Sequence, residues 1–345
     1  YVTLDGGKNW FKWTQGVPTS SVRDIAIQIR ESDLVIATHG RGIFIIDDYS
    51  ALRNLSKKDF SGGMKLLSVT DGQQYRIKDS PSTSSPGSGE YRGTNEPYGA
   101  MITFMLSDPG LPIPNVVTQI NLEDEKSEGK FKATIKIRNA KGNIIKTFYT
   151  SVYQGINRIV WDMSLEKFRQ YPSKKQPKAL PGPAPRSAMH ALQGEYGFTI
   201  SYKEEQISGL LNILADPRFD IAIENRQANN DGLMQLGKLQ ERNVIAIENI
   251  RDERRNAEQI LLSTKHLEDD AHELLLNLAK DMNQALDDVE YLLWKRPGTV
   301  GYTPSNHVAF KIGKVMTHIY SHWDRPTQGN LRNIKIAEIV LEEAE

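Results

Sequence analysis

Cysteine is missing from the 345-residue sequence. Its absence excludes disulfide bonds, thiolate metal sites and cysteine nucleophiles. An excess of charge is also missing, because 43 Lys and Arg residues balance 43 Asp and Glu residues. This balance gives no support for nucleic acid or an anionic membrane as a partner. No uninterrupted apolar run approaches the roughly 18 residues that a membrane-spanning helix needs. We therefore expect neither a nucleic-acid partner nor a transmembrane segment.

Motifs for nucleotide cofactors and for serine nucleophiles are missing as well. The sequence holds no P-loop, no dinucleotide-binding fingerprint and no serine-centred elbow, and its glycines stand in turns between predicted strands. We therefore expect no cofactor. The first residue is Tyr1, and no signal-peptide pattern follows it. We interpret the sequence as a piece of a longer chain, so the missing leader is no argument against export.

The opening stretch, YVTLDGGKNWFKW, predicts a tight hairpin. Residues 1–4 and 10–14 alternate as strands do, and residues 5–7 form a strong turn signal. A short carboxylate accepts hydrogen bonds from the backbone N–H groups of its own loop, and glycine adopts a positive φ without a Cβ clash. We therefore interpret Asp5 as a structural clamp, with a catalytic acid as the alternative. We expect Trp10 to fold back beneath the hairpin.

Three further strands follow at a spacing of about ten residues. They are predicted at 22–29 (VRDIAIQI), 33–39 (DLVIATH) and 42–48 (GIFIIDD), with tight turns at 31–32 and 40–41. Short antiparallel strands at this spacing are typical of a propeller blade. Two partial blades cannot close a propeller, so we expect the remaining blades to precede this sequence or to lie on another piece of the protein.

Motifs in this region carry a resemblance to a known family. Four residues fit the pattern Ser/Thr-x-Asp-x-Gly-x-Thr/Asn-Trp of the Asp-box, or BNR repeat, in sialidase-like and sortilin-like β-propellers: Thr3, Asp5, Gly7 and Trp10. Residues 33–55 resemble the end of the last blade in large bacterial propeller proteins of the sortilin-like and BNR-repeat glycosyl hydrolase kind. The resemblance implies that residues 1–60 are the last blade or blades of a propeller. It also implies that the Asp-box is structural and lies at the blade periphery.

The middle of the chain predicts a linker and then a β-sandwich. Residues 79–93 (DSPSTSSPGSGEYRG) are rich in Ser, Pro and Gly, so we interpret 61–95 as a flexible linker. Short alternating strands with glycine turns and an internal Trp161 predict an immunoglobulin-like sandwich over 96–218. A Pro-rich insertion at 171–186 interrupts it. A sandwich of this kind also follows the propeller in the family that the sequence resembles.

The last third of the chain predicts a helical bundle, at residues 219–345. Apolar residues step at helical spacing among many charges, and four helices are expected. Their approximate ranges are 233–260, 267–294, 306–323 and 328–344. The segments TPSNHVAFKIGKV and DRPTQGN resemble parts of the helical tail in the same family. The predicted fold class is thus multidomain, β plus α: the end of a propeller, a sandwich and a bundle.

His39 and Arg41 are the candidate binding residues within the blade. They flank the turn between its second and third strands, on the propeller face where ligands usually dock. An imidazole exchanges protons near neutral pH, and a guanidinium clamps a carboxylate or a sugar. The alternative is that Arg41 ties neighbouring blades together through backbone carbonyls.

Two further groups of residues carry weaker signals for chemistry. Asp47 and Asp48 are adjacent on a predicted strand, so their side chains point to opposite faces and cannot form a glycosidase pair with each other. His318 and His322 are four apart on a predicted helix, a spacing that can ligate zinc. They lack the glutamate of HExxH and an evident third ligand, so a packing or solvated role is the favoured interpretation, and we expect no metal site.

Two functions follow from the sequence and the resemblance. The first is a noncatalytic scaffold, bacterial and extracytoplasmic, that binds a protein, a peptide or a glycan and contributes to a larger cell-surface assembly. The second is a glycoside hydrolase whose active site lies in blades upstream of Tyr1.

Overall fold

The computed structural model describes residues 1–12, 20–60, 62–76, 96–113, 120–121, 131–171, 189–264, 269–294 and 307–344. The chain divides into two compact units. The β unit contains Tyr1–Glu166 and Gln193–Phe219, and the helical unit contains Asp220–Glu345. The described residues 167–171 and 189–192 also belong to the helical unit.

The β unit begins with a hairpin and a three-stranded antiparallel sheet. Val2 and Phe11 form the bridge of the hairpin. The sheet consists of β1 (Val22–Gln28), β2 (Asp33–Thr38) and β3 (Ile43–Ile46), in that order. The three predicted strands are confirmed, each ending within two residues of its expected bounds. The described residues form this one blade-like sheet and no closed circle of blades.

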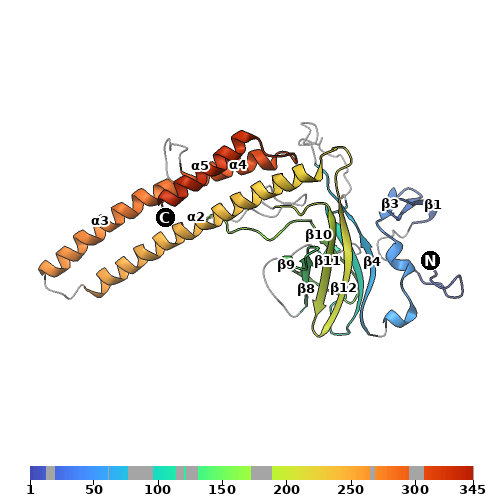
Figure 1. The fold of residues 1–345 in the computed structure, drawn as a ribbon. Helices are drawn as coiled ribbons and strands as arrows, with labels where there is room; N and C mark the ends of the chain where they lie inside the picture. The colour runs from blue at the N-terminus through green and yellow to red at the C-terminus, as the bar shows by residue number, and fades with distance from the viewer. Residues whose placement is uncertain are drawn as a thin grey trace. The chain divides into compact units, whose positions relative to one another are not determined.

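Two larger sheets make up the rest of the β unit (Figure 1). One has the order β4-β6-β10-β7 and the other the order β5-β12-β11-β8-β9. The strands of the first are β4 (Gly63–Thr70), β6 (Ala100–Ser107), β10 (Gly155–Trp161) and β7 (Ile120–Asn121). Those of the second are β5 (Gly72–Gln73), β12 (Glu205–Leu214), β11 (Gly194–Tyr202), β8 (Lys132–Arg138) and β9 (Ile144–Ser151).

The two larger sheets pack against each other around one apolar core. Phe104 on β6 and Trp161 on β10 are fully buried from one side, and Phe148 and Phe198 are fully buried from the other. The sheets approach closely at Gly209 on β12, where a Cβ atom would lie within 3.3 Å of a Leu66 methyl on β4. The alternating patterns of β8 and β9, with every second residue buried, place their apolar faces in this core.

The predicted linker at 61–95 is wrong over its first part. Residues 63–73 form β4 and β5, and β4 pairs with β6 along its whole length. A β-bulge between Leu66 and Ser68 shifts the register there, so the period of two that marks a strand is broken in the sequence. The Ser-, Pro- and Gly-rich segment 79–93 lies outside the described residues, as does most of the insertion at 171–186.

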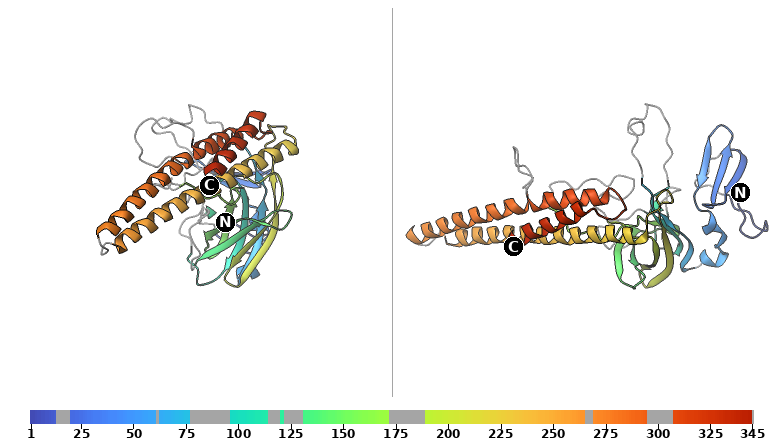
Figure 2. Two further views of the ribbon diagram at one scale, coloured as in Figure 1. Left: turned by 60° about the vertical axis from the view of Figure 1, so that its left-hand side comes forward. Right: turned by 45° about the horizontal axis from the view of Figure 1, so that its top comes forward.

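The described part of the helical unit contains four helices, where four were expected (Figure 2). They are α2 (Ile223–Ser263), α3 (Asp269–Leu293), α4 (Val308–Tyr320) and α5 (Gln328–Ala344). Each of α3, α4 and α5 contacts α2, and α2 and α3 run side by side as a long hairpin. Two short helices, α1 (Ser50–Arg53) and η1 (Lys57–Phe60), belong to the β unit. Among the described residues, no helix combines the length and apolar character needed to cross a bilayer.

Candidate functional site

The turn at Asp5 is closed by a set of local hydrogen bonds. One carboxylate oxygen of Asp5 accepts from the backbone N–H of Asn9 at 2.9 Å, and the other accepts from the Asn9 side-chain amide at 2.6 Å. Thr3 adds its hydroxyl to the same carboxylate and accepts from the N–H of Gly7 at 2.8 Å. The hydrogen bonds from Asn9, foremost that of its side chain, lower the pKa of Asp5. Asp5 is thus committed to its own loop.

Trp10 lies against this turn without being buried by it. Its indole N–H donates to the carbonyl of Gly7 at 3.1 Å, and Gly7 adopts the positive φ of 90° that the turn requires. The indole is nevertheless 60% exposed. Trp10 therefore folds back towards the turn as expected, but it does not fill the space beneath the hairpin. Its ring instead forms an exposed apolar surface.

The turn that carries His39 and Arg41 has an ordered backbone. The backbone N–H and the hydroxyl of Thr38 both donate to the carbonyl of Gly42, at 3.1 and 2.7 Å. The N–H of His39 donates to Ser21 at 2.9 Å, which ties the turn to the chain that enters β1. Both candidate side chains are exposed. The described part of the chain offers neither of them a hydrogen-bond or ion-pair partner, so the ligand role and the inter-blade role of Arg41 both stay predictions.

Both faces of the three-stranded sheet carry apolar side chains. Directly opposed residues of antiparallel strands share a face. Six apolar residues from the three strands lie on the first face: Ile25, Ile27, Leu34, Ile36, Phe44 and Ile46. The second face is mixed, with Ala26, Val35, Ala37, Ile43 and Ile45 beside the polar residues Asp24, Gln28 and Asp33.

Large apolar side chains on both faces of this sheet are exposed. Ile25 on the first face is 57% exposed, and Ile45 on the second is 58% exposed. An antiparallel sheet with one solvated face alternates apolar and polar residues, whereas a sheet that is covered on both faces is apolar throughout. The first face therefore has the composition of a covered surface, and the large exposed apolar side chains on both faces mark an interaction site.

Asp48 anchors the exit from β3 to the first large sheet. Its buried carboxylate accepts hydrogen bonds from the backbone N–H and hydroxyl of Ser50 and, at 2.7 Å, from the hydroxyl of Ser68 on β4. Its carbonyl accepts from the guanidinium of Arg158 on β10 at 2.6 Å. The φ of Asp48 is +40°, so the chain turns sharply here.

The prediction that Asp47 and Asp48 lie on one extended strand is wrong. β3 ends at Ile46, because the positive φ of Asp48 breaks the extended backbone. The two carboxylates still have different surroundings. Asp48 contacts serine hydroxyls, whereas burial first and then the charge of Asp33 raise the pKa of Asp47.

Asp47 belongs to an acidic cluster around Arg158. Burial, and then the charge of Asp33, raises the pKa of Asp47 against the opposing effect of Arg158. Partial burial also raises the pKa of Glu96, and the charges of Asp47, Asp33 and Glu31 add to it. Raised pKa values in a carboxylate cluster are a feature of functional sites and of structural networks alike. Within the described residues, no group of three or more such side chains has an arrangement that could hold a metal ion.

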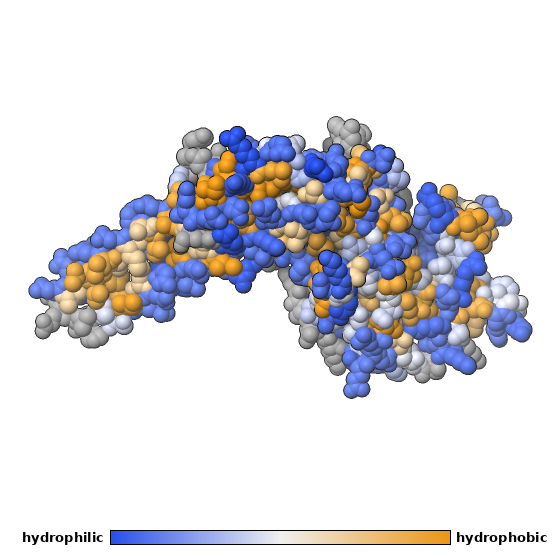
Figure 3. All heavy atoms as spheres, viewed as in Figure 1, coloured by the Kyte–Doolittle hydropathy of each residue, from blue (hydrophilic) through white to orange (hydrophobic). Residues whose placement is uncertain are grey.

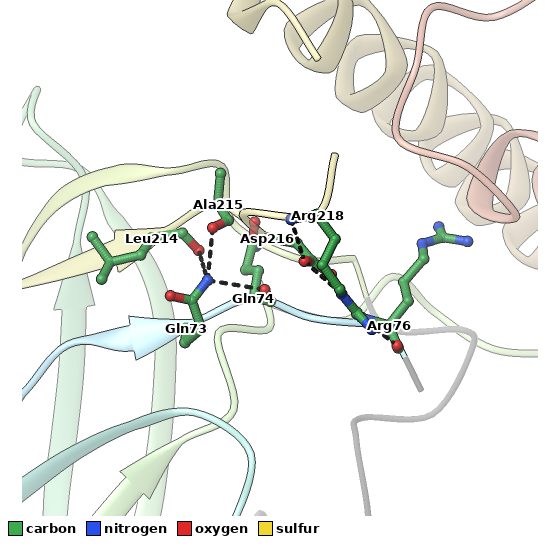
Figure 4. A network of polar contacts seen from close by, with 7 residues as sticks. All are labelled: Gln73, Gln74, Arg76, Leu214, Ala215, Asp216 and Arg218. Atoms are coloured by element: carbon green, nitrogen blue, oxygen red, sulfur yellow. Dashed lines mark hydrogen bonds and ion pairs between the residues drawn. The ribbon is translucent and has the colours of Figure 1, made fainter. Parts of the chain in front are cut away.

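Asp216 forms a second polar network where the β unit ends (Figure 4). Its buried carboxylate accepts from the Arg218 guanidinium at 2.9 and 2.6 Å, from the Arg218 N–H at 3.0 Å and from the Arg76 N–H at 3.3 Å. Arg218 also donates to the Arg76 carbonyl at 2.9 Å. The Arg218 guanidinium foremost, with these backbone donors, lowers the pKa of Asp216 to about 2. The network fastens β12 to the chain that leaves β5.

Comparison with known proteins finds no matching family model, no matching curated protein and no matching solved structure. The local geometry therefore stands alone as support for any function.

The histidine pair of the helical unit does not share a helix face. α4 ends at Tyr320, so His322 lies beyond the helix, where its Nδ1 lies 3.1 Å from the carbonyl of Asp324. His318 is exposed on the last turn. The spacing that suggested a zinc pair is lost, because the chain leaves the helical path towards Pro326.

Sequence patterns did not reveal the partners of Asp48 and Asp216. Arg158 stands 110 positions from Asp48, and Arg76 stands 140 positions from Asp216. Contacts over such separations leave no local spacing to detect. The only available signal was the cluster of charge at Asp216 and Arg218, two residues apart.

Proposed function

We propose that this chain is the C-terminal part of a bacterial, extracytoplasmic BNR-repeat propeller protein of the sortilin-like kind. Its function is that of a noncatalytic scaffold that binds a protein, a peptide or a glycan, within a larger cell-surface assembly. The observation that carries the proposal is that the sheet β1–β3 exposes large apolar side chains on both of its faces. A propeller blade is packed between two neighbouring blades, so it needs two apolar faces.

The hairpin at Thr3 and Asp5 supports the same proposal. Its carboxylate binds backbone and side-chain donors of its own loop, as the structural turn of an Asp-box requires. The hairpin precedes β1 in the chain, which is the order expected when one blade finishes and the next begins. Other blades then supply the neighbours that cover the exposed faces of β1–β3.

The strand order of the two larger sheets supports an immunoglobulin-like sandwich. In that fold the strands A, B and E share one sheet, and G, F, C and C′ share the other. The order β4-β6-β10 matches the first set, and β12-β11-β8-β9 matches the second. The first strand divides between both sheets, because β5 pairs in parallel with β12 after β4 has paired with β6. One departure is that Trp161 lies on the strand in the E position rather than C.

The binding surface that we propose is the turn at His39 and Arg41. Its backbone is ordered while both side chains reach solvent, so the loop is already in place for a carboxylate or a sugar and only the side chains have to be ordered on binding. A turn of this kind at the end of each blade would build one continuous face.

The experiment is a binding screen of the intact gene product against glycan and peptide libraries, with a hydrolysis assay on polysaccharides in parallel. For a ligand found in this way, Arg41→Ala should weaken binding about tenfold. Arg30→Ala is the matched control, because Arg30 is also exposed but follows β1 at the opposite end of the sheet. If Arg30→Ala weakens binding as much as Arg41→Ala, the proposed surface is wrong.

A glycoside hydrolase is the second candidate function. Burial foremost raises the pKa values of Asp47 and Glu96, which is the direction of shift that a general acid requires. The sequence-based hypothesis places the catalytic carboxylates in upstream blades instead. Polysaccharide cleavage by the intact protein, lost on changing an upstream carboxylate or in Glu96→Gln, would refute the scaffold function and would also separate these two locations.

A further inference from the structure

The helix α3 contacts α2, α4 and α5, and its apolar surface is wider than these contacts cover. At about 100° per residue, its apolar side chains occupy an arc of roughly 200°, whereas a helix that packs on one side needs an apolar stripe about 100° wide. The side of α3 that faces α2 is marked by the ion pairs of Arg254 with Asp287 and Glu290. The rest of the arc extends away from that contact.

The part of this arc that points away from α2 is called here the outer stripe. It consists of Ala271, Leu274, Leu278, Ala285 and Leu292. Leu274 is 61% exposed and Leu278 is 56% exposed. Figure 3 shows apolar residues gathered on the hairpin of α2 and α3, bordered by hydrophilic ones. An apolar helix face of this length in water indicates that something covers it.

The charge of α3 limits what that partner can be. The helix contains seven acidic residues and a single Lys280. Asp287 and Glu290 are paired with Arg254, at 2.5 and 3.1 Å. Asp281 and Asp288, both exposed, are seven residues apart and border the outer stripe in the helical projection. A partner lying along the stripe therefore meets a row of negative charge beside an apolar strip.

We propose that the outer stripe of α3 binds a cationic amphipathic helix of a partner protein. The apolar face of that helix covers Leu274, Leu278 and Leu292, and its Lys or Arg residues pair with Asp281 and Asp288. This is a helix-to-helix contact of the coiled-coil kind, in which flanking charges select the partner. The α3 of a second copy is a poor occupant, because it would set acidic residues against acidic residues. The proposal is independent of the function proposed for the blade.

The test is a fluorescence-anisotropy titration of the 345-residue chain with labelled helical peptides. The first peptide has about four heptads with Leu at the core positions and Lys beside them. The second carries Glu in place of Lys, and the third has the composition of the first with its Leu residues scattered around the helix. We expect the first peptide to bind with a Kd on the order of 10 μM, weakening as salt rises, and the other two to bind at least tenfold more weakly.

Variants locate the binding surface. Leu274→Gln combined with Leu278→Gln should weaken binding of the first peptide about tenfold, since both leucines are exposed and glutamine retains helix propensity. Asp281→Lys combined with Asp288→Lys should weaken it at least as much, and added salt should then no longer weaken binding, because it screens a repulsion instead of an attraction. Leu331→Gln and Glu343→Lys on α5 are the matched controls and should bind the peptide as the unchanged chain does.

Three results would overturn the proposal. One is equal binding of the acidic peptide, which would remove the role of charge. Another is unchanged peptide binding by the leucine variants. The third is a dimer of the unchanged chain in sedimentation velocity that the leucine variants convert to a monomer, since a second copy would then occupy the outer stripe.

Discussion

The ring of Phe168 occupies the space that a side chain on Gly237 would need. A Cβ atom built on Gly237 would lie 2.0 Å from a ring carbon of Phe168, well inside van der Waals contact. Both residues belong to the helical unit, in which residues 167–171 form an extended strap on α2. Gln240 and Asn243 hold the same strap through the Arg169 carbonyl at 2.6 Å and the Tyr171 hydroxyl at 2.9 Å.

Gly237→Ala is expected to destabilise the protein by about 2 kcal/mol or more, although alanine gains about 1 kcal/mol of helix propensity. The ring of Phe168 must move to make room for the methyl group, and the strap then loses its packing against α2. Chemical denaturation monitored by circular dichroism measures the change. Gly313→Ala in α4 is the matched control, because a Cβ there meets nothing within 4 Å. That variant should be as stable as the unchanged chain or more stable, and equal losses in both would contradict the role of Phe168.

Asp48→Ala is expected to cost about 2 kcal/mol, because it leaves Ser50 and Ser68 without their acceptor and puts alanine at a positive φ. Asp48→Asn should cost less, since asparagine tolerates this backbone and keeps one acceptor oxygen. Thermal unfolding of the two variants gives the comparison. An Asp48→Asn variant less stable than Asp48→Ala would contradict the proposed anchor.

Asp216 predicts a loss of stability in acid. Its folded pKa of about 2 lies below the ordinary value of 3.8, so its contribution is present above pH 4 and is lost as the pH falls towards 2. The shift corresponds to about 2 kcal/mol. Asp216→Asn should therefore be less stable than the unchanged chain at pH 6, and the difference should shrink towards pH 2. A difference that stays constant over this range would exclude the ionised carboxylate as its source.

Asp47 predicts the opposite dependence on pH. Burial raises its folded pKa, so the protonated form is favoured and stability falls as the pH rises through that value. Asp47→Asn removes the buried charge and should make the protein more stable at pH 7, with no gain at pH 3. Guanidinium unfolding at both pH values tests this. A variant that is less stable at pH 7 would show that attraction to Arg158 outweighs burial.

Strands with regular alternation were predictable, and irregular ones were not. The strand β8 buries every second residue, which is the regular alternation by which strands were predicted within 96–218. The strand β4 was missed because of its β-bulge at Leu66. The bulge places two leucines next to each other, which breaks the alternation, and the neighbouring polar residues resemble a linker. Backbone turns that depend on distant partners, such as the one at Asp48, have no local signature. The propeller itself stays a prediction.

The candidate sites show the same division. The hydrogen bonds around Asp5 connect residues at most four positions apart, so a short pattern described them in advance. The cluster around Arg158 brings together side chains from segments far apart in the sequence, and only the folded chain shows it. His322 was misplaced because the predicted helix extended three residues past the end of α4 at Tyr320.

The uninterrupted length of α2 fixes a distance within the helical unit. A continuous helix of 41 residues measures about 60 Å, so the tip of the hairpin is held at a set reach from the end where α2 begins. Adding seven residues to both α2 and α3 would lengthen that reach by about 10 Å while keeping every side chain on its original face. The number of helical turns in α2 therefore sets the distance between the start of α2 and the tip of the hairpin.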